Sequence, residues 1–390
     1  MSRIRSLALI VAMLALLAAP VRSAEPVQIN VILALTGSGA LLGSSARTGL
    51  GVLEKRINAT GGIAGRPVQF VIADDQSNPQ VAVQIANQLI AKNVSVILGS
   101  SLVALCAAIV PLLKNGPVLY CFSPGIHPPP GSYAFTAGIA SGDLMAAQIH
   151  YLHDRNLKKL AWIGTTDASG QDGEAGLDAA VALPENAGMS VIDREHFTIG
   201  DLGIDAQMAR IKAANPDAIV SWASGTPMAT VMRGIQESGT DKVPLLISAA
   251  NLGYAALKNY AATLGPSDYT AANAIFSADA VTDGAVKRAL VEMSAAYTSA
   301  GLRADFLTAI PWDPATIVVS ALRKLGPDAT ATQIRDYIAG LRGFVGTNGR
   351  YDFGKVPQRG LSAENAYVVR WDGPGDKFVP VSRAGGVPVR

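Results

Sequence analysis

Several kinds of site are missing from this chain of 390 residues. No Gly-x-Ser-x-Gly, Ser-x-x-Lys or His-Glu-x-x-His occurs, so no hydrolase constellation can be assembled and we expect no enzyme. Only four histidines are present. Two of them, His150 and His153, could share a helix face, but they lack a third ligand nearby and a solvated face is the simpler interpretation. We therefore expect no metal site.

An excess of charge is missing as well. The chain has 32 Lys and Arg against 30 Asp and Glu, with neither a basic stripe nor a block of like charges, so we expect no nucleic-acid partner. The apolar run from Leu7 to Ala19, which follows Arg3 and Arg5, has thirteen residues. That is too few for the ~20 that a helix needs to span a bilayer.

This N-terminal pattern predicts a cleaved signal peptide over residues 1–23. Cleavage after Ser23 would leave Ala24, not Cys, at the new terminus, which gives no signal for a lipid anchor. We expect an exported protein, most simply a periplasmic one. The 367 residues that remain, 390 minus 23, exceed what one hydrophobic core usually serves, so we expect two lobes.

Strand-like and helix-like patterns alternate from Val27 onward. Apolar runs are separated by helical patterns, the runs at 27–35, 67–75, 94–99 and 117–122 and the helices at 45–58, after Pro79 and at 101–114. Continuous apolar strands between amphipathic helices predict a parallel sheet covered on both faces. A second run of the same kind starts at Lys158 and continues through Pro216–Gly225 and Val243–Asn251. The sequence therefore predicts two similar α/β lobes.

The stretch LALTGSGALLG, residues 33–43, raises the question of a nucleotide cofactor, because glycine-rich turns from strand to helix bind phosphates. Gly43 comes one place too late for the dinucleotide fingerprint, and the acidic Asp74 and Asp75 stand more than thirty residues beyond it. A P-loop needs a lysine, and residues 27–54 contain none. The turn fits neither phosphate motif, so we expect no cofactor.

The same residues resemble type I periplasmic substrate-binding proteins, the leucine/isoleucine/valine-binding-protein group that feeds ABC importers. The resemblance covers nearly the whole mature chain, through AWIGTTDASGQDG, YDFGKVPQRG and AYVVRWDG. Its main matching positions are Thr36-Gly37, Gly43, Asn58, Gly61-Gly62-Ile63, Gly65, Asp74-Asp75, Pro79 and Ser123-Pro124. The resemblance implies two Rossmann-like lobes, each a parallel sheet with helices on both faces, joined by three hinge crossings. The glycine turn then lines a solute cleft beyond the carboxyl ends of the strands.

The resemblance also implies how the chain is divided and what it does. We expect one lobe from residues 24–140 and 280–345 and a second from 141–279 and 346–390. We expect a monomeric solute-binding component of an ABC importer, which closes on a small organic ligand and delivers it to a membrane permease. A ligand sensor for a signalling receptor is one alternative. An enzyme with this fold is another, and the missing catalytic motifs disfavour it.

The first-lobe candidates for ligand contact are Leu42, Ser100, Ser101, Gly125 and His127. Relatives often have an aromatic residue where Leu42 stands and a threonine where His127 stands. Ser100 and Ser101 open the helix at 101–114, so they could cap it or hold an anion on its N-terminal N–H groups. His127 could brace its proline-rich loop or donate to the ligand. Gly125 would offer its backbone N–H.

The second-lobe candidates are Ser169, Thr226 and Asn251. Ser169 and Thr226 take the places of cleft aromatics, and relatives hold a ligand's α-ammonium with an acidic residue near Asn251. An ammonium buried without a carboxylate partner is costly. We therefore predict that an aromatic or other small carboxylate without an α-amino group binds better than a branched-chain amino acid. Asp167 or Asp172, in a neighbouring loop, could supply the missing charge instead.

Cys106 and Cys121 are the only cysteines. In an oxidising compartment a bond between them is favoured over two free thiols, so we expect a structural disulfide. Trp222 and Trp312 are interpreted as core packing rather than as ligand stackers.

Overall fold

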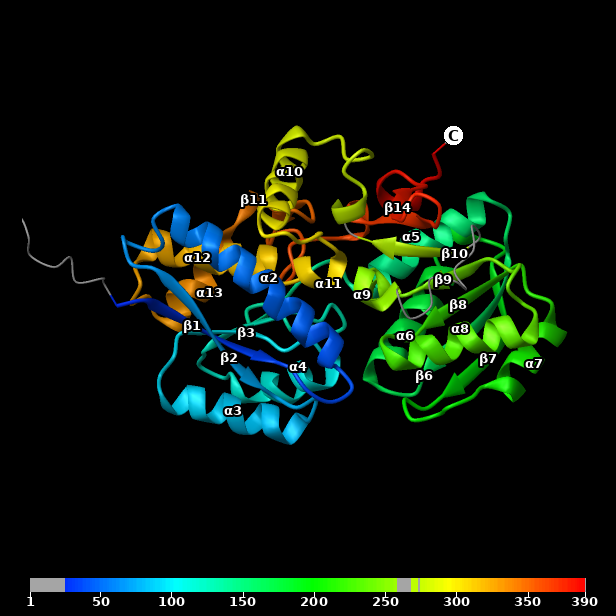
Figure 1. Cartoon of the computed structure of the whole chain (residues 1–390), viewed down its shortest axis with the longest axis horizontal. Helices are drawn as coiled ribbons and strands as arrows, with labels where there is room; N and C mark the ends of the chain where they lie inside the picture. Colours follow the sequence, from blue (N-terminus) through cyan, green and yellow to red (C-terminus); the bar gives the residue numbers. More distant parts are fainter. Residues whose placement is uncertain (1–24, 258–267, 273, 390) are drawn as a thin grey trace, which may run out of the picture.

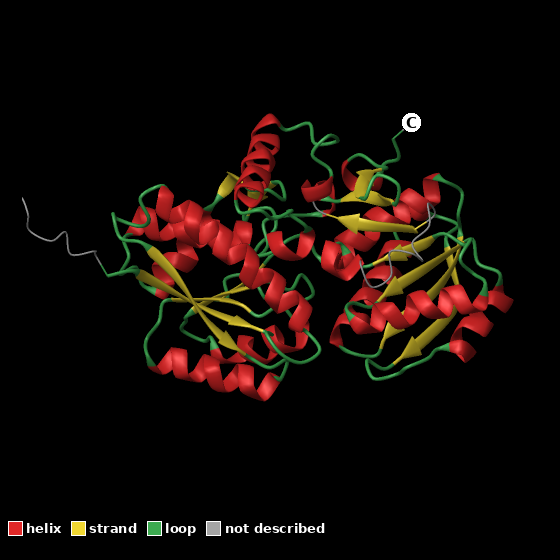
Figure 2. Cartoon of the chain, viewed as in Figure 1, coloured by secondary structure: helices red, strands yellow, loops and turns green. Residues whose placement is uncertain are grey.

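The computed structural model describes residues 25–257, 268–272 and 274–389, so the predicted signal peptide lies outside the described residues. Two sheets stand side by side, each flanked by helices (Figure 1 and Figure 2). Within the described ranges, none of the helices combines the length and the apolar character that crossing a membrane requires.

The first sheet has five strands in the order β2-β1-β3-β4-β5, and every neighbouring pair is parallel. The strands are β1 (Val27–Leu33), β2 (Val68–Asp74), β3 (Val96–Gly99), β4 (Val118–Cys121) and β5 (Ala134–Thr136). Three of the helices that flank it are α2 (Ala40–Ala59), α3 (Pro79–Ala91) and α4 (Val103–Ile109).

Both faces of this sheet are buried because its central strands are apolar on both sides. In β1, Val31 and Leu33 belong to the hydrophobic core that includes Leu50 of α2. Ile32, between them, belongs to a separate core that includes Ala86 of α3. Successive strand residues point to opposite faces, so one apolar run supplies both cores. This is what the alternating sequence pattern predicts.

The second sheet has seven strands in the order β14-β13-β10-β9-β8-β6-β7. Its parallel strands are β6 (Lys159–Thr165), β7 (Ser190–Phe197), β8 (Ala218–Trp222), β9 (Leu245–Ile247) and β10 (Asp268–Ala272). The predicted two-lobed α/β architecture is confirmed, with one difference at this edge. Here β13 (Tyr367–Asp372) pairs antiparallel with both β10 and β14 (Lys377–Pro380). The short turn between β13 and β14 cannot make the crossover that parallel strands need.

The remaining elements complete the two lobes. They are α5 (Ser141–Asp154), α6 (Ala168–Val181), α7 (Asp205–Ala214), α8 (Thr226–Ser238), α9 (Tyr254–Leu257), α10 (Gly284–Ser299), α11 (Phe306–Ala309), α12 (Trp312–Leu325), α13 (Ala331–Gly340), β11 (Arg342–Val345) and β12 (Arg350–Asp352). Helices α11 and α12 contact α2, and α13 contacts β4. The chain therefore passes between the sheets three times, after β5, after β10 and after β12.

One segment departs from the predicted division of the chain, which assigned residues 346–390 to the second lobe. Thr136 N, at the end of β5, donates to Gln358 O at 3.0 Å. The side-chain amide of Gln358 donates to Ser132 O and Ala134 O at 2.9 and 3.1 Å. The chain around residue 358 thus lies along the edge of the first sheet. The other lobe limits stay a prediction.

Candidate ligand-binding cleft

The loops that follow the strands of the two sheets face one another. A Cβ atom on Gly225, after β8, would lie 3.9 Å from Ser38 O, after β1. A Cβ atom on Gly125, after β4, would come within 2.8 Å of Asp172 Oδ2 in α6. The carboxyl ends of both sets of parallel strands therefore meet here, at the place where open α/β sheets bind their ligands.

The glycine turn after β1 is held in shape by polar groups of the protein itself. Asp74 accepts hydrogen bonds from Thr36 N and Thr36 Oγ1 at 3.3 and 2.8 Å. Ser77 Oγ accepts from Gly39 N at 3.0 Å and donates to Thr36 O at 2.7 Å. Loss of solvation opposes the ionisation of Asp74, but its hydrogen bonds, with Gln76 N first among them, outweigh this and lower its pKa. Asp74 and Ser77 thus fix the backbone of the turn on both sides of Gly37.

The two adjacent serines after β3 have different environments. Ser100 is fully buried, and its Oγ donates to Asp75 Oδ2 at 2.6 Å. Burial raises the pKa of Asp75 in spite of this bond. Ser101 is 8% exposed, and its Oγ has no hydrogen-bond partner among the described residues. Helix α4 begins at Val103 without a side-chain cap, so the capping hypothesis is wrong for both serines. Of the two, only Ser101 keeps an unpaired hydroxyl.

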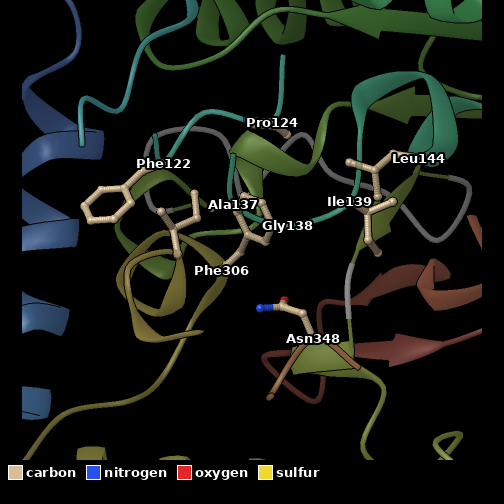
Figure 3. A pocket seen from close by; sticks show the side chains of 9 residues that line it. Phe122, Pro124, Ala137, Gly138, Ile139, Leu144, Phe306 and Asn348 are labelled. Carbon is tan, nitrogen blue, oxygen red and sulfur yellow. The ribbon is translucent and has the colours of Figure 1, made fainter. Parts of the chain in front are cut away.

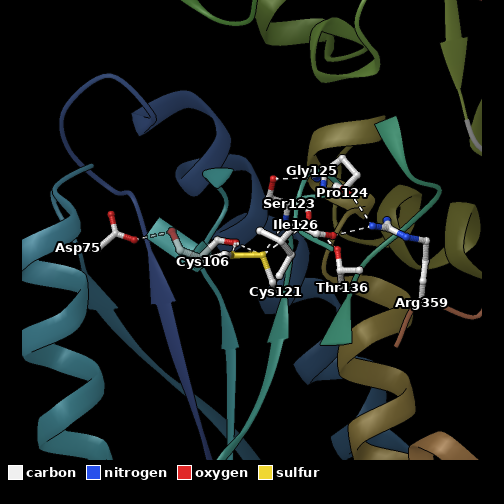
Figure 4. Close-up of a disulfide and its surroundings, with 10 residues drawn as sticks. Asp75, Cys106, Cys121, Ser123, Pro124, Gly125, Ile126, Thr136 and Arg359 are labelled. Carbon is white, nitrogen blue, oxygen red and sulfur yellow. Dashed lines mark hydrogen bonds between the residues drawn. A yellow bond between two sulfur atoms is a disulfide. The ribbon is translucent and has the colours of Figure 1, made fainter. Parts of the chain in front are cut away.

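The predicted disulfide lies behind the loop after β4 and is confirmed (Figure 4). Cys106 of α4 is bonded to Cys121 of β4, with Cα atoms 6.1 Å apart, and both residues are fully buried. Next to it, Ser123 N donates to Cys121 Sγ at 3.3 Å, and Thr136 Oγ1 donates to Ser123 O at 2.6 Å. These contacts tie the start of the loop to both α4 and β5.

A histidine and a carboxylate join the two lobes across the cleft. His127 Nε2 lies 2.7 Å from Asp172 Oδ1. The His127 side chain is 62% exposed, whereas that of Asp172 is only 15% exposed. The other carboxylate oxygen, Asp172 Oδ2, is buried and has no hydrogen-bond partner within the described part of the chain. Asp172 thus brings into the cleft the carboxylate that the position near Asn251 lacks. Donation from His127 to a ligand stays a prediction.

The other predicted contacts fall into two groups. Leu42, Ser169 and Thr226 lie in the first turns of α2, α6 and α8, at the carboxyl edges of their sheets, and none of them is fully buried. Asn251 is fully buried, and its Nδ2 donates to Ala223 O at 2.8 Å. The Asn251 side chain therefore joins two loops of its own lobe, and a contact between Asn251 and a ligand stays a prediction.

A small apolar cavity lies beside the loop after β4 (Figure 3). It measures about 20 Å³, room for about one water molecule, and is lined by Phe122, Pro124, Ala137, Gly138, Ile139, Leu144, Phe306, Ile310 and Asn348. Asn348 is 3% exposed. Its Nδ2 donates to Asp313 Oδ2 at 2.7 Å, whereas its Oδ1 has no partner among the described atoms. The cavity thus has a mostly apolar lining, and the side chain of Asn348 brings an unpaired acceptor to it.

A family comparison agrees with this geometry. The sequence profile of a family described as periplasmic binding protein matches residues 26–377, which is most of the chain. The chain belongs to this family. Its curated relatives include a Leu/Ile/Val-binding protein homologue of Brucella melitensis, 23% identical over 195 residues, which are 50% of this chain and 53% of the relative. The chain thus spans about half the length of the curated relatives it matches.

Solved structures of binding proteins match over a greater length. The branched-chain amino acid binding protein LivJ of Streptococcus pneumoniae, in complex with isoleucine, has a TM-score of 0.76 at 19% identity, covering 91% of this chain and 100% of that one. A solute-binding protein of Rhodopseudomonas palustris in complex with benzoate has a TM-score of 0.73 at 18% identity, covering 93% and 97%. At such identities the likeness concerns the fold alone.

In this periplasmic binding protein the structure brings Asp172 to the cleft where sequence reasoning favoured Ser169. Both residues precede a glycine, so the sequence alone does not separate them. A Cβ atom on Gly173 would lie 2.2 Å from the Trp222 ring, and this close packing places the first turns of α6 against β8. Trp222 and Trp312 are 5% and 6% exposed, which confirms that both are core residues.

Arg359 was not among the residues predicted from the sequence. It lies within the stretch YDFGKVPQRG, which resembles the family as a whole but contains no residue with an expected ligand contact. The side chain is 5% exposed and reaches the loop after β4 (Figure 4). An arginine in a polar, glycine-containing segment is usually exposed, so its burial could be known only from the fold.

Proposed function

We propose that this protein is the periplasmic solute-binding component of an ABC importer, which closes on a small organic ligand between its two lobes and passes it to a membrane permease. Family membership supports the class of function. The observation that carries the proposal is a pair of buried, unpartnered polar atoms, Ser101 Oγ and Asp172 Oδ2, one from each lobe. Leaving such atoms unpaired costs about 1–3 kcal/mol each, so a ligand that pairs with both would stabilise the closed form.

The chemistry of these atoms restricts the ligand. The Ser101 hydroxyl can donate to a carboxylate, whereas the backbone N–H of Gly125 already donates to Ser123 Oγ at 3.4 Å. Asp172 Oδ2 can only accept while ionised, so the ligand must present an N–H or O–H group to it. The small cavity beside the loop after β4 has room for about one water molecule, so it cannot hold the body of the ligand. The proposed apolar contact is Leu42, which is partly buried in the first turn of α2. The proposed ligand is therefore a small organic acid with an apolar body and at least one further donor.

Two ligand classes meet this description. An aromatic or other hydroxy acid would place its hydroxyl on Asp172, and the benzoate complex of a structural relative supports an aromatic acid. A branched-chain amino acid would place its ammonium there, and the presence of Asp172 in the cleft supports this alternative more strongly than the sequence did. Tighter binding of an acid without an α-amino group stays the prediction that we test.

Isothermal titration calorimetry with leucine, phenylalanine, benzoate and 4-hydroxybenzoate would separate the classes. A ligand at about a hundred times its Kd should also raise the free energy of unfolding by about 2.7 kcal/mol. Sub-micromolar leucine binding without a response to either aromatic acid would reject the hydroxy-acid prediction. A response to 4-hydroxybenzoate but not to benzoate would support a hydroxyl on Asp172.

The Asp172→Asn variant identifies the donor that the ligand uses. The amide keeps the shape but loses the charge, so affinity for an ammonium should fall by the ~1.5–3 kcal/mol of a charged hydrogen bond, and affinity for a neutral hydroxyl by less. Ser101→Ala is expected to weaken any carboxylate ligand by ~1–3 kcal/mol. A ligand that is indifferent to both substitutions would place the binding site elsewhere.

A sensor that reports to a signalling receptor would use the same cleft. Pull-down of a membrane permease by the ligand-bound protein favours transport, whereas capture of a receptor's periplasmic domain favours sensing.

A further inference from the structure

Arg359 is a buried cation that lies at the junction of the two lobes. It follows Gln358, whose backbone and side chain are hydrogen-bonded to the β5 edge of the first sheet. Only 5% of Arg359 is exposed. Burial of a guanidinium is costly unless its N–H donors are hydrogen-bonded and its charge is compensated. The groups around Arg359 therefore indicate its role.

The guanidinium donates to three backbone carbonyls. Arg359 Nη2 donates to Pro124 O and to Ile126 O, each at 2.8 Å, and Nη1 donates to Gly138 O at 3.4 Å. The first two carbonyls flank Gly125 in the loop that reaches the cleft, and the third belongs to the crossing after β5. The planar fork of arginine can bind several acceptors with fixed geometry, which a lysine cannot reproduce. Arg359 thus fixes the backbone on both sides of Gly125.

A carboxylate of the opposite lobe approaches the loop that Arg359 holds, because a Cβ atom on Gly125, between the two bonded carbonyls, would lie 2.8 Å from Asp172 Oδ2. Burial lowers the pKa of Arg359 to about 10, and the negative charges of Asp143 in α5 and Asp172 in α6 counteract this effect. Burial raises the pKa of Asp143. The charge of Arg359 opposes this shift first, followed by a hydrogen bond from the backbone N–H of Ala363 and then by His127. The first lobe thus presents Arg359 and His127, and the second lobe presents Asp143 and Asp172.

We propose that Arg359 is a positioning residue for ligand binding. It holds the loop Pro124–His127 in the conformation that receives Asp172, and it supplies positive charge where the carboxylates of the second lobe arrive on closure. It does this without contacting the ligand. Loss of Arg359 leaves the carbonyls of Pro124 and Ile126 without their donor and weakens the attraction between the closed lobes.

The test combines two measurements, because the effect on affinity rests on the proposed function and the effect on the loop does not. Hydrogen exchange is measured on the ligand-free protein at the residues of 123–131 that carry a backbone N–H, which are Ser123, Gly125, Ile126, His127 and Gly131. The other four residues are prolines and have none. Affinity is measured by calorimetry with whichever of leucine, phenylalanine, benzoate and 4-hydroxybenzoate binds the unaltered protein. Should none of the four bind, the ligand prediction fails, while hydrogen exchange still decides the role of Arg359.

Arg359→Gln is expected to speed exchange in this segment and to weaken binding, each by about tenfold or more, the equivalent of about 1.4 kcal/mol. Arg359→Lys should have intermediate effects on exchange and affinity, because it keeps the charge but loses the planar guanidinium. If Arg359→Gln does not fold, the lysine variant provides the test by itself. Arg342→Gln is the matched control. Arg342 also donates to two backbone carbonyls, Ala339 O and Leu341 O, but its side chain is 54% exposed and lies outside the cleft.

A double-mutant cycle with Asp172→Asn separates positioning from general stability. If Arg359 acts through the loop that receives Asp172, the second substitution should weaken binding less in the Arg359→Gln background than in the unaltered protein. Additive effects on affinity, together with unchanged exchange over residues 123–131, would overturn the proposal. The same holds if Arg342→Gln changes both measurements as much as Arg359→Gln does.

Discussion

Removal of the Cys106–Cys121 disulfide should reduce stability mainly through the unfolded chain. The bond joins α4 to the next strand, β4, and spans a sequence separation of 15. In the chain-entropy description, releasing a loop of this length returns about 3 kcal/mol of conformational freedom to the unfolded state. Both residues are fully buried, so replacing them with alanine also leaves small cavities, each worth up to ~1 kcal/mol.

Reduction and substitution separate these two contributions. Urea unfolding with and without reductant measures the loss of the bond alone, because the sulfur atoms remain. The Cys106→Ala/Cys121→Ala variant adds the cavities. We expect reduction to lower the free energy of unfolding by about 3 kcal/mol and the double substitution to lower it further.

The ligand affinity of the reduced protein is a separate test of the same reasoning. Ser123 N donates to Cys121 Sγ, but Thr136 and Arg359 hold the loop from the other side. Affinity should therefore change much less than stability. Two free thiols in the unreduced periplasmic protein, or a difference in unfolding free energy below about 1 kcal/mol on reduction, would refute the argument.

Two further predictions concern packing and pH. Gly49→Ala in α2 should lower the free energy of unfolding by about 2–3 kcal/mol, because its Cβ would lie 1.8 Å from Thr308 O. Gly51→Ala has nothing within 4 Å of its Cβ, so it should stabilise the helix by ~0.5–1 kcal/mol. Thermal unfolding of the two variants measures both effects, and equal effects would contradict this reasoning. Arg350 and two backbone N–H groups lower the pKa of Asp283 to about 2. The stabilisation from ionised Asp283 is present above pH ~4 and is lost as pH falls towards 2. Asp283→Asn keeps the N-cap but not the charge, so its unfolding midpoint should lose this pH dependence. The same acid profile in both proteins would show that the Asp283–Arg350 pair contributes nothing to stability.

Local signals in the sequence were sufficient for most of the fold. Asn78 and Pro79 predict the start of α3, and Asn78 Oδ1 does accept from Gln80 N and Val81 N. The apolar runs predict parallel strands with two buried faces, and the two cysteines predict a bond. Each of these follows from neighbours in the chain or from residue type, and so it is visible before the chain folds.

The site was only partly visible in this way. Sequence placed its loops correctly at the carboxyl ends of the strands, because that position is a property of parallel sheets. The sequence did not show which side chains of these loops form hydrogen bonds within their own lobe and which remain free for a ligand. Ser100 is bonded to Asp75 and Asn251 to Ala223, whereas Ser101 keeps an unpaired hydroxyl.

By itself, then, the sequence determined the family, the two α/β lobes and the edge at which they meet, since periodicity and turn residues act over short distances. Only the tertiary structure decided that Asp172 enters the cleft opposite His127 and that Arg359 lies buried behind Gly125. These contacts join residues 45 and more than 200 positions apart, and their energies depend on desolvation and on the distance between charges. Both are properties of the packed lobes, which no local pattern of residues encodes.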